Sequence, residues 1–429
     1  MVMIAMSGGV DSAVSAAKLL ESGYEVEGLH MTNWRDDEPY CTASQDLQDA
    51  KNACKEIGIP MHHVDFSNEY RKDVFDESLL ELRSGLTPNP DILCNQMIKF
   101  DSFIQHAKRL GAKKIATGHY ARTSMKNDES LLLKGTDQNK DQTYFLHGIK
   151  ASVLDDVLFP VGSMKKEEVR DYAYKKGLPN HDKPDSTGIC FIGERPFKNF
   201  IQTFLPPEPG KIVTEDGETL GAHDGLMYFT LGQRKDIGIG GLKNHSGEPW
   251  YVASKNIDTN ELLVVQGRNH KKLWQNQAFA KDMNWLNDDF RKKVLKGNPI
   301  ACKAKCRYRQ ADAKCEIQLH KDGIRVVFDE DQWAITHGQY LVIYLNDVCM
   351  GGGKIFNCLK TSFWFRKSIL PFQFFPNFTM VSNPYSCVIM CPINMTINTC
   401  IAVMGAKYIV SWNPMLRVAG AIFLSPLSR

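Results

Sequence analysis

The stretch "IAMSGGVDSAV" (Ile4–Val14) places two glycines, two serines and an aspartate directly after an apolar run. The run Val2–Met6 is typical of a short buried strand, and the chain from Asp11 onward has the alanines and leucines of a helix that ends at Gly23. The glycines therefore fall in a tight turn, where the backbone can approach a ligand closely. A helix N-terminus behind such a turn favours anions, so this turn is predicted to hold a phosphate group. The alternative is an ordinary connection between a strand and a helix.

Strands and helices alternate through the rest of the first half. Further strands are expected at 24–31, 61–66 and 113–120, and further helices at 44–57, 69–83, 100–110 and 165–176. This alternation predicts an α/β fold with a doubly wound parallel sheet. Ligands bind such sheets beyond the carboxyl ends of the strands, where "SGGVDS" and "TGHY" (117–120) both fall.

The residue pattern changes twice in the second half. "LPPEPGKIV" is a proline-rich junction followed by glycine-rich, short-stranded sequence, and from about Asn269 the chain alternates or runs apolar as β-strands do. We therefore expect a nucleotide-binding catalytic domain over 1–196, a small central domain over 197–268 and an antiparallel β-barrel over 269–356. The remaining tail, 357–429, has no assigned role.

Composition narrows the class of protein. The chain of 429 residues is 43% hydrophobic and 24% charged, which is typical of globular domains. Twelve cysteines in a chain this long do not indicate a disulfide scaffold. They form no CxxC pair, so a zinc site is not expected either, and no metal ligand is predicted. The start resembles no signal or transit segment and no apolar run could span a bilayer, so a cytoplasmic protein is expected, with the mitochondrial matrix as the alternative.

The net charge of +3 is unevenly distributed. The tail has six basic and no acidic residues, so Met1–Phe356 carries a net charge near −3. A nucleic-acid partner would therefore need a local basic surface.

Two cysteines stand out because of the loops that contain them. Cys94 follows the proline-stiffened "TPNPDILCN", and Cys190 lies in the glycine-containing "DSTGICFIGER". A single cysteine is most often a small buried hydrophobic residue. Cysteines in loops near carboxylates and hydroxyls can instead be thiolates. Such a pair could pass on sulfur from a persulfide and then close as a disulfide.

The motifs together resemble a known family. "SGGVDS" is the signature of PP-loop enzymes, which split ATP into AMP and pyrophosphate, and no Walker A motif occurs. The ordered motifs that extend the resemblance are "TPNPDILCN", "ATGHYAR", "KDQTYFL", "DSTGICFIGER", "GLMYFTLGQR", "EPWYV", "CRYRQ" and "VCMGGGKI". Over about Met1–Phe356 the chain is similar to the tRNA-specific 2-thiouridylases. The resemblance implies a fold like the adenine nucleotide alpha hydrolases.

The resemblance also implies a reaction and its participants. ATP, with Mg²⁺, adenylates the C2 oxygen of the wobble uridine of tRNA, and sulfur then replaces that oxygen. A cysteine desulfurase or a sulfur-relay protein supplies the persulfide sulfur. The enzyme is expected to be a monomer, and no membrane is expected among its partners.

Individual residues acquire roles from the same resemblance. Cys190 carries the persulfide, Cys94 is the partner thiol, and Asp91 is a proton shuttle. The positions that match ATP-binding positions are Ala5, Met6, Ser7, Gly8, Gly9, Val10, Asp11, Ser12, Met31 and Gly118. The positions that match tRNA-contacting positions are Asn89, Pro90, Asp91, His119, Lys140, Asp141, Gln142, Arg307, Tyr308 and Gln339.

The chain departs from the family pattern at two positions. Thr32 stands where the family usually has a lysine, and His337 where it usually has a proline. Two other functions stay open. A PP-loop synthetase or amidotransferase acting on a small molecule would need neither paired cysteines nor an RNA-binding barrel. A non-catalytic RNA-binding module would not need an intact "SGGVDS".

Overall fold

The computed structural model describes residues 1–34, 43–127, 129–185, 197–240 and 245–360, together with 380–383, 386–390, 408–411 and 421–426. The chain divides into two compact units, Met1–Thr361 and Ser362–Arg429. The second unit contains the antiparallel strands β18 (Met380–Asn383), β19 (Ser386–Met390), β20 (Tyr408–Ser411) and β21 (Ala421–Pro426), in the order β18-β19-β21-β20. Everything below concerns the first unit.

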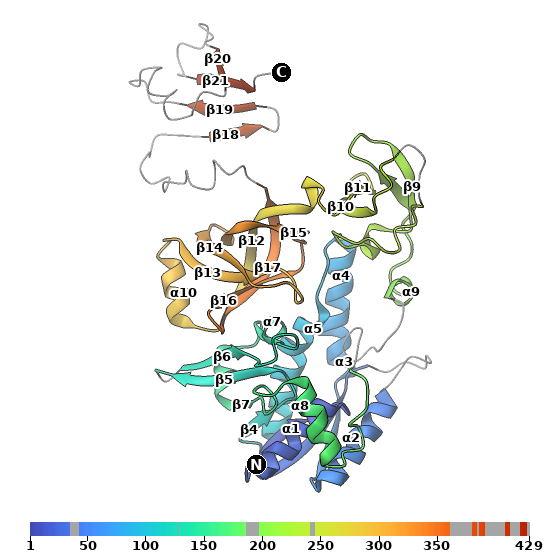
Figure 1. Cartoon of the computed structure of the whole chain (residues 1–429), viewed down its shortest axis with the longest axis vertical. Helices are drawn as coiled ribbons and strands as arrows, with labels where there is room; N and C mark the ends of the chain where they lie inside the picture. Colours follow the sequence, from blue (N-terminus) through green and yellow to red (C-terminus); the bar gives the residue numbers. More distant parts are fainter. Residues whose placement is uncertain are drawn as a thin grey trace. The chain divides into compact units, whose positions relative to one another are not determined.

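A five-stranded parallel sheet forms the N-terminal part (Figure 1). Its order is β3-β2-β1-β4-β7, and its strands are β1 (Val2–Ala5), β2 (Val26–Thr32), β3 (Met61–Asp65), β4 (Lys114–Ala116) and β7 (Val157–Leu158). Because β1 lies between β2 and β4, the chain segments that follow these three strands meet at one edge of the sheet. The expected parallel α/β fold is confirmed.

Helices bury an apolar core on each face of this sheet. One core includes residues of α1 (Val10–Glu21), α2 (Ala43–Ile57) and α8 (Lys166–Lys175). The other includes residues of α3 (Ser67–Tyr70), α4 (Glu77–Arg83), α5 (Pro90–Leu93) and α6 (Phe103–Arg109). π-helical stretches, Arg71–Asp76 and Cys94–Ser102, join α3 to α4 and α5 to α6.

One expected strand is shorter than the sequence indicated. The apolar run 113–120 forms a strand only over Lys114–Ala116, because the chain then turns toward α1. A hairpin that the sequence analysis did not predict follows, made of β5 (Ala121–Lys126) and β6 (Glu129–Lys134). α7 (Thr143–Leu146) comes next in the chain.

The central part is a small four-stranded sheet after the helix α9 (Phe197–Gln202). Its order is β10-β11-β8-β9, and its strands are β8 (Gly210–Val213), β9 (Thr219–His223), β10 (Trp250–Asn256) and β11 (Glu261–Gln266). β11 pairs with β8 in parallel, and the other pairs are antiparallel.

The last part is a closed barrel of six antiparallel strands. The strands are β12 (Trp274–Trp285), β13 (Ile300–Lys305), β14 (Ala313–His320), β15 (Gly323–Trp333), β16 (Tyr340–Leu345) and β17 (Val348–Leu359). Neighbours pair in the order β12-β15-β14-β13-β16-β17, and β12 also pairs with β17, which closes the ring. The helix α10 (Asp288–Leu295) connects β12 to β13. The expected barrel is confirmed.

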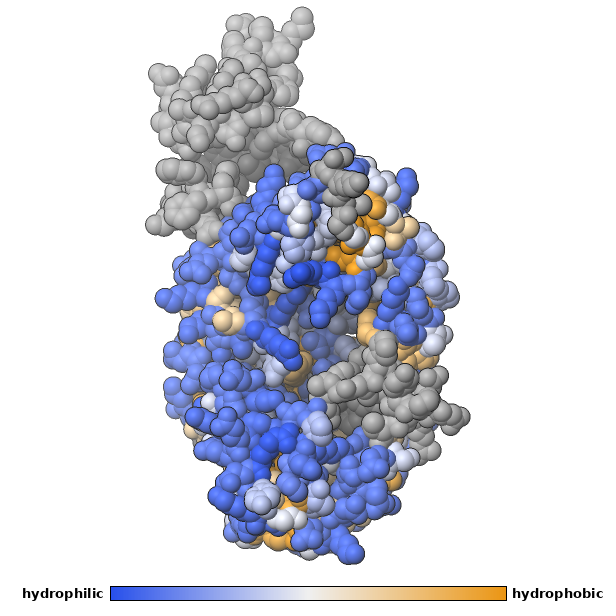
Figure 2. All heavy atoms as spheres, turned by 45° about the vertical axis from the view of Figure 1, so that its right-hand side comes forward, coloured by the Kyte–Doolittle hydropathy of each residue, from blue (hydrophilic) through white to orange (hydrophobic). Residues whose placement is uncertain are grey.

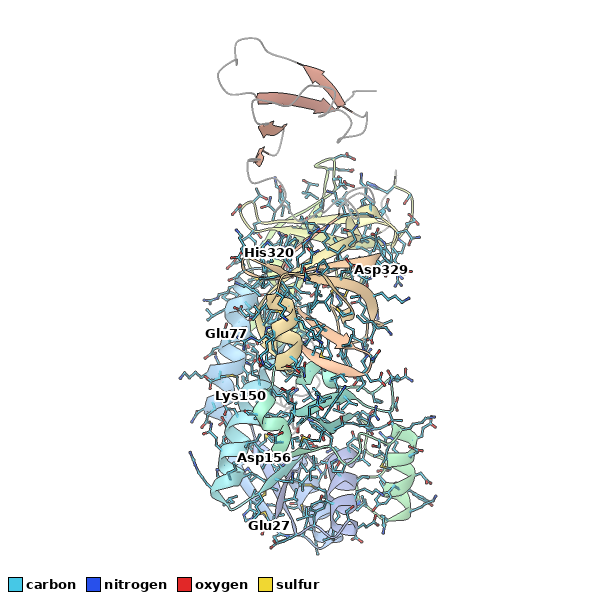
Figure 3. The ribbon with its side chains drawn as sticks, turned by 90° about the vertical axis from the view of Figure 1, so that its left-hand side faces the viewer. Glu27, Glu77, Lys150, Asp156, His320 and Asp329 are labelled. Carbon is cyan, nitrogen blue, oxygen red and sulfur yellow. The ribbon has the colours of Figure 1, made fainter. Side chains whose placement is uncertain are left out.

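The three parts share one apolar core. It includes Met3 and Leu29 of the parallel sheet, Val252 of the central sheet and Tyr344 of the barrel. Figure 3 shows the span of this unit, with Glu27 on the parallel sheet, Glu77 on α4 and His320 on the barrel. The face of the molecule drawn in Figure 2 is mostly hydrophilic with a few separate hydrophobic patches. In the described part of the chain, no helix is both long and apolar enough to cross a bilayer.

Candidate active site

The turn after β1 has the geometry of an anion site. Gly8 has a φ of +81°, and a Cβ placed there would lie 2.5 Å from the backbone oxygen of Asp46 on α2. The Ser12 hydroxyl donates to the Gly9 carbonyl oxygen at 2.9 Å and lies 3.2 Å from the Ser7 hydroxyl. These bonds hold the turn against the start of α1, whose first N–H groups have no partner within the helix. The backbone and hydroxyl groups together can hold a phosphate.

The loop after β4 lies directly against this turn. A Cβ placed at Gly118 would be 2.8 Å from both the carbonyl carbon of Asp11 and the backbone nitrogen of Ser12, so only glycine permits this approach. Met31, near the end of the neighbouring β2, is buried. The structure therefore brings Met31, Gly118 and the turn 5–12 to one edge of the sheet.

Asp11 is held by two groups from other parts of the chain. Its carboxylate accepts from the Tyr120 hydroxyl at 2.7 Å and from Lys166 Nζ at 2.7 and 2.8 Å. The Lys166 side chain is 11% exposed and the Asp11 side chain 31%, so water screens this ion pair only partly. A Mg²⁺ ion that used Asp11 would share its carboxylate with Lys166.

Lys166 also connects the turn to Asp185. Lys166 Nζ lies 2.8 Å from Asp185, whose carboxylate also accepts from Lys140 at 2.7 Å and from Arg170 at 2.9 Å. Burial alone would raise the pKa of Asp185, but the hydrogen bonds from Lys140 and Lys166 outweigh it and lower the pKa to about 2. Asp185 is therefore an anion at neutral pH, one residue before the segment 186–196.

The segment 85–88, which leads to Asn89, is fixed by both the central part and the barrel. Lys255 Nζ of β10 donates to the Gly85 carbonyl oxygen at 3.2 Å. From the barrel, Gln339 Nε2 donates to the carbonyl oxygens of Thr87 at 2.9 Å and Pro88 at 3.2 Å. The backbone N–H of Thr87 donates in turn to the His337 carbonyl oxygen at 3.0 Å. Both C-terminal parts thus set the position of Asn89, Pro90 and Asp91.

Cys94 is placed by the helix that follows this segment. Pro90 is the first residue of α5, and Cys94 begins the π-helical stretch after it. Such stretches are frequent at functional sites because they displace a side chain from the regular helical position. The Cys94 side chain is buried. Asn95 beside it donates to the Phe145 carbonyl oxygen at 3.2 Å, which joins this helix to α7. Cys190 lies outside the described residues, so the Cys94–Cys190 pairing stays a prediction.

The residues expected to contact tRNA occupy different environments. His119 is half-buried between Phe100 and Phe159, and burial lowers its pKa well below the usual range, with a further contribution from Lys99. Asp141 is buried and accepts from the backbone of Gly135 at 3.1 Å. In this conformation Asp141 therefore supports its own loop.

Other expected tRNA contacts have structural partners as well. Gln142 accepts from the Tyr120 backbone N–H at 2.9 Å. Arg307 donates to the Leu231 and Ala334 carbonyl oxygens at 2.7 and 2.9 Å, and Tyr308 packs 4.3 Å from the Phe145 ring. These contacts hold the barrel against the central part and against α7.

Sequence reasoning missed Lys166, Tyr120, Asn180 and Asp185. Asn180 donates to the Gly8 carbonyl oxygen at 3.1 Å, from 172 positions away in the chain. The local sequences of Tyr120, inside "TGHY", and of Asp185, the first residue of "DSTGICFIGER", offered a signal. Lys166 and Asn180 lie in ordinary helical or loop sequence and reach the site through the fold.

Comparisons with known proteins agree with this architecture. Family models match in three consecutive ranges: the tRNA methyl transferase HUP domain over residues 1–194, its PRC-barrel domain over 198–266 and the aminomethyltransferase β-barrel domain over 275–355. The tRNA-specific 2-thiouridylase MnmA of Pseudomonas fluorescens is 50% identical over 356 residues, which cover 82% of this chain and 94% of that protein. The chain belongs to the tRNA-specific 2-thiouridylase family.

Two further relatives of this family show the same extent of similarity. The enzyme of Stutzerimonas stutzeri is 51% identical over 82% of this chain and 94% of its own length. The enzyme of Hahella chejuensis is 49% identical over 84% of this chain and 98% of its own. The match to the family thus accounts for nearly the whole of each relative and leaves about a sixth of this chain outside it.

Proposed function

We propose that this protein replaces the C2 oxygen of the wobble uridine in tRNA by sulfur, with ATP as the activating substrate. The observation that carries the proposal is the identity of about one half with 2-thiouridylases over nearly their full length. The HUP model is named for methyl transfer, whereas the relatives are named for thiolation. The two cysteines in "TPNPDILCN" and "DSTGICFIGER" favour sulfur chemistry.

The edge of the parallel sheet suits ATP. The turn 5–12 supplies backbone N–H groups and the Ser7 hydroxyl for phosphate oxygens, and the absence of a side chain at Gly118 lets the loop 117–120 pack directly against the start of α1. When the uridine C2 oxygen attacks the α-phosphorus, pyrophosphate leaves and the uridine becomes adenylated. Donors already fixed in place would stabilise the negative charge that develops on the leaving pyrophosphate. Mg²⁺ with the nucleotide is part of the proposal.

The two thiols would then carry out the exchange. The terminal sulfur of a Cys190 persulfide attacks C2, and AMP leaves with the original oxygen. The Cys94 thiolate attacks the Cys190 sulfur, the bond between Cys190 and the transferred sulfur breaks, and a Cys94–Cys190 disulfide forms as thiolated tRNA is released. Asp91, three residues before Cys94, is proposed to accept the Cys94 proton. An external thiol must reduce the disulfide before the next turnover.

The RNA would reach this site through segment 89–91 and residues nearby. A uridine in a single-stranded loop is the easiest base to extract from its stack. Lys140, His119 and Gln339 are proposed to contact the RNA, together with Arg307, Tyr308, Asp141 and Gln142. For Lys140 this contact would compete with its ion pair to Asp185. A sulfur-donor protein, a monomeric enzyme and a cytoplasmic reaction complete the proposal, with the mitochondrial matrix as the alternative compartment.

A reconstituted reaction tests the proposal. The purified protein is mixed with ATP, a persulfide donor and unmodified tRNA, and nucleosides are analysed by mass spectrometry after digestion. We expect 2-thiouridine at the wobble position, one AMP per sulfur, and loss of product in Cys94→Ser and Cys190→Ser with ATP binding intact. ATP consumption with a small amine acceptor but not with tRNA would favour a small-molecule synthetase. Full thiolation by either cysteine variant would contradict the assigned thiol roles.

A further inference from the structure

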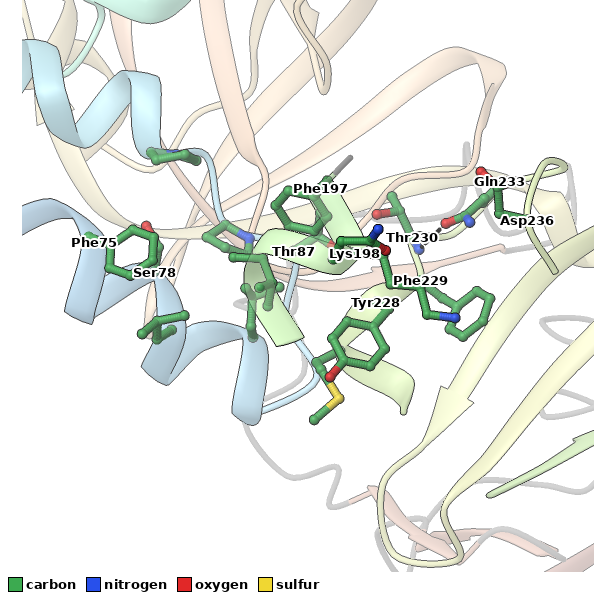
Figure 4. Close-up of a pocket in the computed structure, with 17 residues that line it drawn as sticks. Phe75, Ser78, Thr87, Phe197, Lys198, Tyr228, Phe229, Thr230, Gln233 and Asp236 are labelled. Carbon is green, nitrogen blue, oxygen red and sulfur yellow. Dashed lines mark hydrogen bonds between the residues drawn. The ribbon is translucent and has the colours of Figure 1, made fainter. Parts of the chain in front are cut away.

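A pocket of about 600 Å³ lies beside the proposed target segment (Figure 4). It is formed by Phe75 and the helix α4 that follows it, by Thr87, Pro88 and Pro90, by α9 and by residues of the stretch 227–236 in the central part. Its volume is in the range of pockets that hold small ligands. The proposed ATP site does not use it. Because Pro90 lines the pocket and also belongs to segment 89–91, a ligand in the pocket would adjoin the target base.

Aromatic rings form much of the pocket wall. Phe75 of the π-helical stretch Arg71–Asp76, Tyr228 and Phe229 are buried, whereas Phe197 at the start of α9 is 43% exposed. Figure 4 shows Phe75 and Ser78 at one end and Gln233 and Asp236 at the other, with Phe197 between them. Gln233 is fixed in its turn, since it accepts from the Thr230 N–H at 3.0 Å and donates to the Lys235 carbonyl oxygen at 2.9 Å. Flat apolar walls around a few fixed polar groups suit a planar heterocycle.

The pocket has one basic lining residue, Lys198, and one acidic lining residue, Asp236, among the residues described. Lys198 lines the pocket and forms an ion pair with Asp224, and Arg234 and Lys235 are exposed next to the lining residue Gln233. Among the described lining residues Lys198 is the cation and Asp236 the anion, so Lys198 is the lining group that can contact a phosphate carried by the heterocycle.

We infer that this pocket binds a base that flanks the target uridine in the anticodon loop. The inference rests on the proposed function. It adds a binding site for the nucleotide next to the target uridine, which the proposed function does not assign to any residues. Turning one base out of a loop also unstacks its neighbours, and an aromatic wall can replace the lost stacking. The pocket adjoins segment 89–91, so a nucleotide next to the target in the RNA can enter it while the target uridine stays at that segment.

Binding of a fluorescent RNA tests the pocket without any chemistry. Anticodon stem-loops carry 2-aminopurine on the 5′ or the 3′ side of the target uridine. With the unaltered protein, fluorescence should rise at one of the two positions as that base leaves its stack. Phe197→Ala should lose most of the rise and Phe197→Trp should keep it. The control is Tyr24→Ala, whose side chain is 42% exposed and lies outside the pocket, and it should match the unaltered protein.

Kinetics separate this inference from the proposed function. Phe197→Ala should raise the KM for a stem-loop about tenfold with little change in kcat. A stem-loop with an abasic residue at the flanking position should have the same effect on the unaltered protein. The two changes together should cost no more than either alone. Thr230→Trp, which fills the pocket, should repeat the effect. The inference is wrong if the unaltered protein thiolates the stem-loop but neither the variants nor the abasic RNA raise the KM. It is also wrong if the increases in KM from the variant and from the abasic RNA add together. If the unaltered protein thiolates no RNA at all, the proposed function is wrong.

Discussion

Asp11 depends on a residue that is distant in the chain. Lys166, 155 positions away, supplies two short hydrogen bonds to its carboxylate, and Tyr120 supplies a third. "SGGVDS" indicated that Asp11 belongs to a site. No local pattern could reveal its partners, because an ion pair between distant residues leaves no signal in sequence spacing. The same holds for Asp185, whose partners Lys140 and Arg170 come from two other segments.

Replacing Lys166 by methionine should destabilise the protein. The change leaves Asp11 and Asp185 without a shared cation, so we expect the free energy of unfolding in urea to fall by about 1.5–3 kcal/mol. The affinity for ATP should fall as well. The control is Lys175→Met on the same helix, whose ion pair with Asp171 is exposed on both sides and should contribute less than about 0.5 kcal/mol. Equal losses in the two variants would contradict the role given to Lys166.

The two departures from the family pattern have structural partners. Thr32, which stands where a lysine is usual, has its hydroxyl 2.8 Å from His63 Nε2. His337, which stands where a proline is usual, uses its carbonyl oxygen to hold Thr87. A proline has a carbonyl oxygen as well, so the contact to Thr87 in the segment 85–88 does not depend on which of the two residues is present.

The loop 117–120 packs against the start of α1 at Gly118, and a substitution there tests this contact between two elements. Gly118→Ala would place a methyl group 2.8 Å from the backbone of Asp11 and Ser12, and backbone atoms there cannot move aside cheaply. We expect an unfolding free energy lower by about 1–3 kcal/mol and weaker ATP binding by calorimetry. Gly221→Ala is the matched control, because a Cβ there meets no atom within 4 Å. An unchanged ATP affinity in Gly118→Ala would contradict the placement of the nucleotide.

The barrel turn that holds segment 85–88 gives a second test of element packing. Gln339→Leu removes the hydrogen bonds to Thr87 and Pro88 and keeps most of the side-chain volume. We expect kcat for thiolation to fall about tenfold or more, because a small displacement of the target base slows the reaction strongly. ATP affinity should not change, since the printed hydrogen bonds of the Gln339 side chain go to Thr87 and Pro88 and not to the residues assigned to the nucleotide. Loss of ATP affinity and kcat together would indicate general destabilisation instead.

Periodicity predicted most elements but not the hairpin β5–β6. The apolar run of β1 and the alternating runs of the barrel were found because each buries one face or both. "ARTSMK" (121–126) is polar and mostly half-exposed or exposed, so its pattern is weak. Asn127, with a φ of 50°, was a turn signal that could have located the hairpin. The positions of Arg307 and Tyr308 between parts of the fold were not predictable, because alternation shows which face a residue occupies and not what covers that face.

At the scale of the molecule, the tail should be dispensable. The last of the three family models ends at residue 355, and the barrel closes with β17 at Leu359. A chain that ends at Thr361 keeps every residue assigned to the site. We expect it to thiolate tRNA at the rate of the full chain and to melt at the same temperature. A large loss of activity in a truncated protein that remains folded would assign the tail a role in the reaction.

Acid should destabilise the whole molecule through its buried histidines. Burial lowers the pKa of His147 from 6.5 to about 4, and it also lowers the pKa values of His30, His119, His223 and His337. Between pH 6.5 and 4 the unfolded chain binds protons at these positions and the native protein does not, so the free energy of unfolding falls as pH falls. His147 alone accounts for a loss on the order of 3 kcal/mol at the acid end.

Urea unfolding at pH 7 and pH 5 measures this dependence. The unaltered protein should lose more stability between the two values than His147→Gln, which cannot take up a proton at this position. The losses in the free energy of unfolding should differ by about 1–2 kcal/mol between the two proteins, because pH 7 to 5 covers only part of the range from 6.5 to 4 over which His147 contributes. Identical losses in the two proteins would show that His147 does not contribute to the pH dependence.

The pairing of β12 with β17 has a consequence for biosynthesis. All five strands of the parallel sheet have left the ribosome once Leu158 has emerged, whereas the barrel cannot close until Leu359, opposite Gln277, is present. The N-terminal part can therefore fold while the rest is still being translated, and the barrel must wait for contacts between residues far apart in the chain. During that interval the apolar surfaces that the three parts later share are open to water, and the nascent enzyme is at its greatest risk of aggregation.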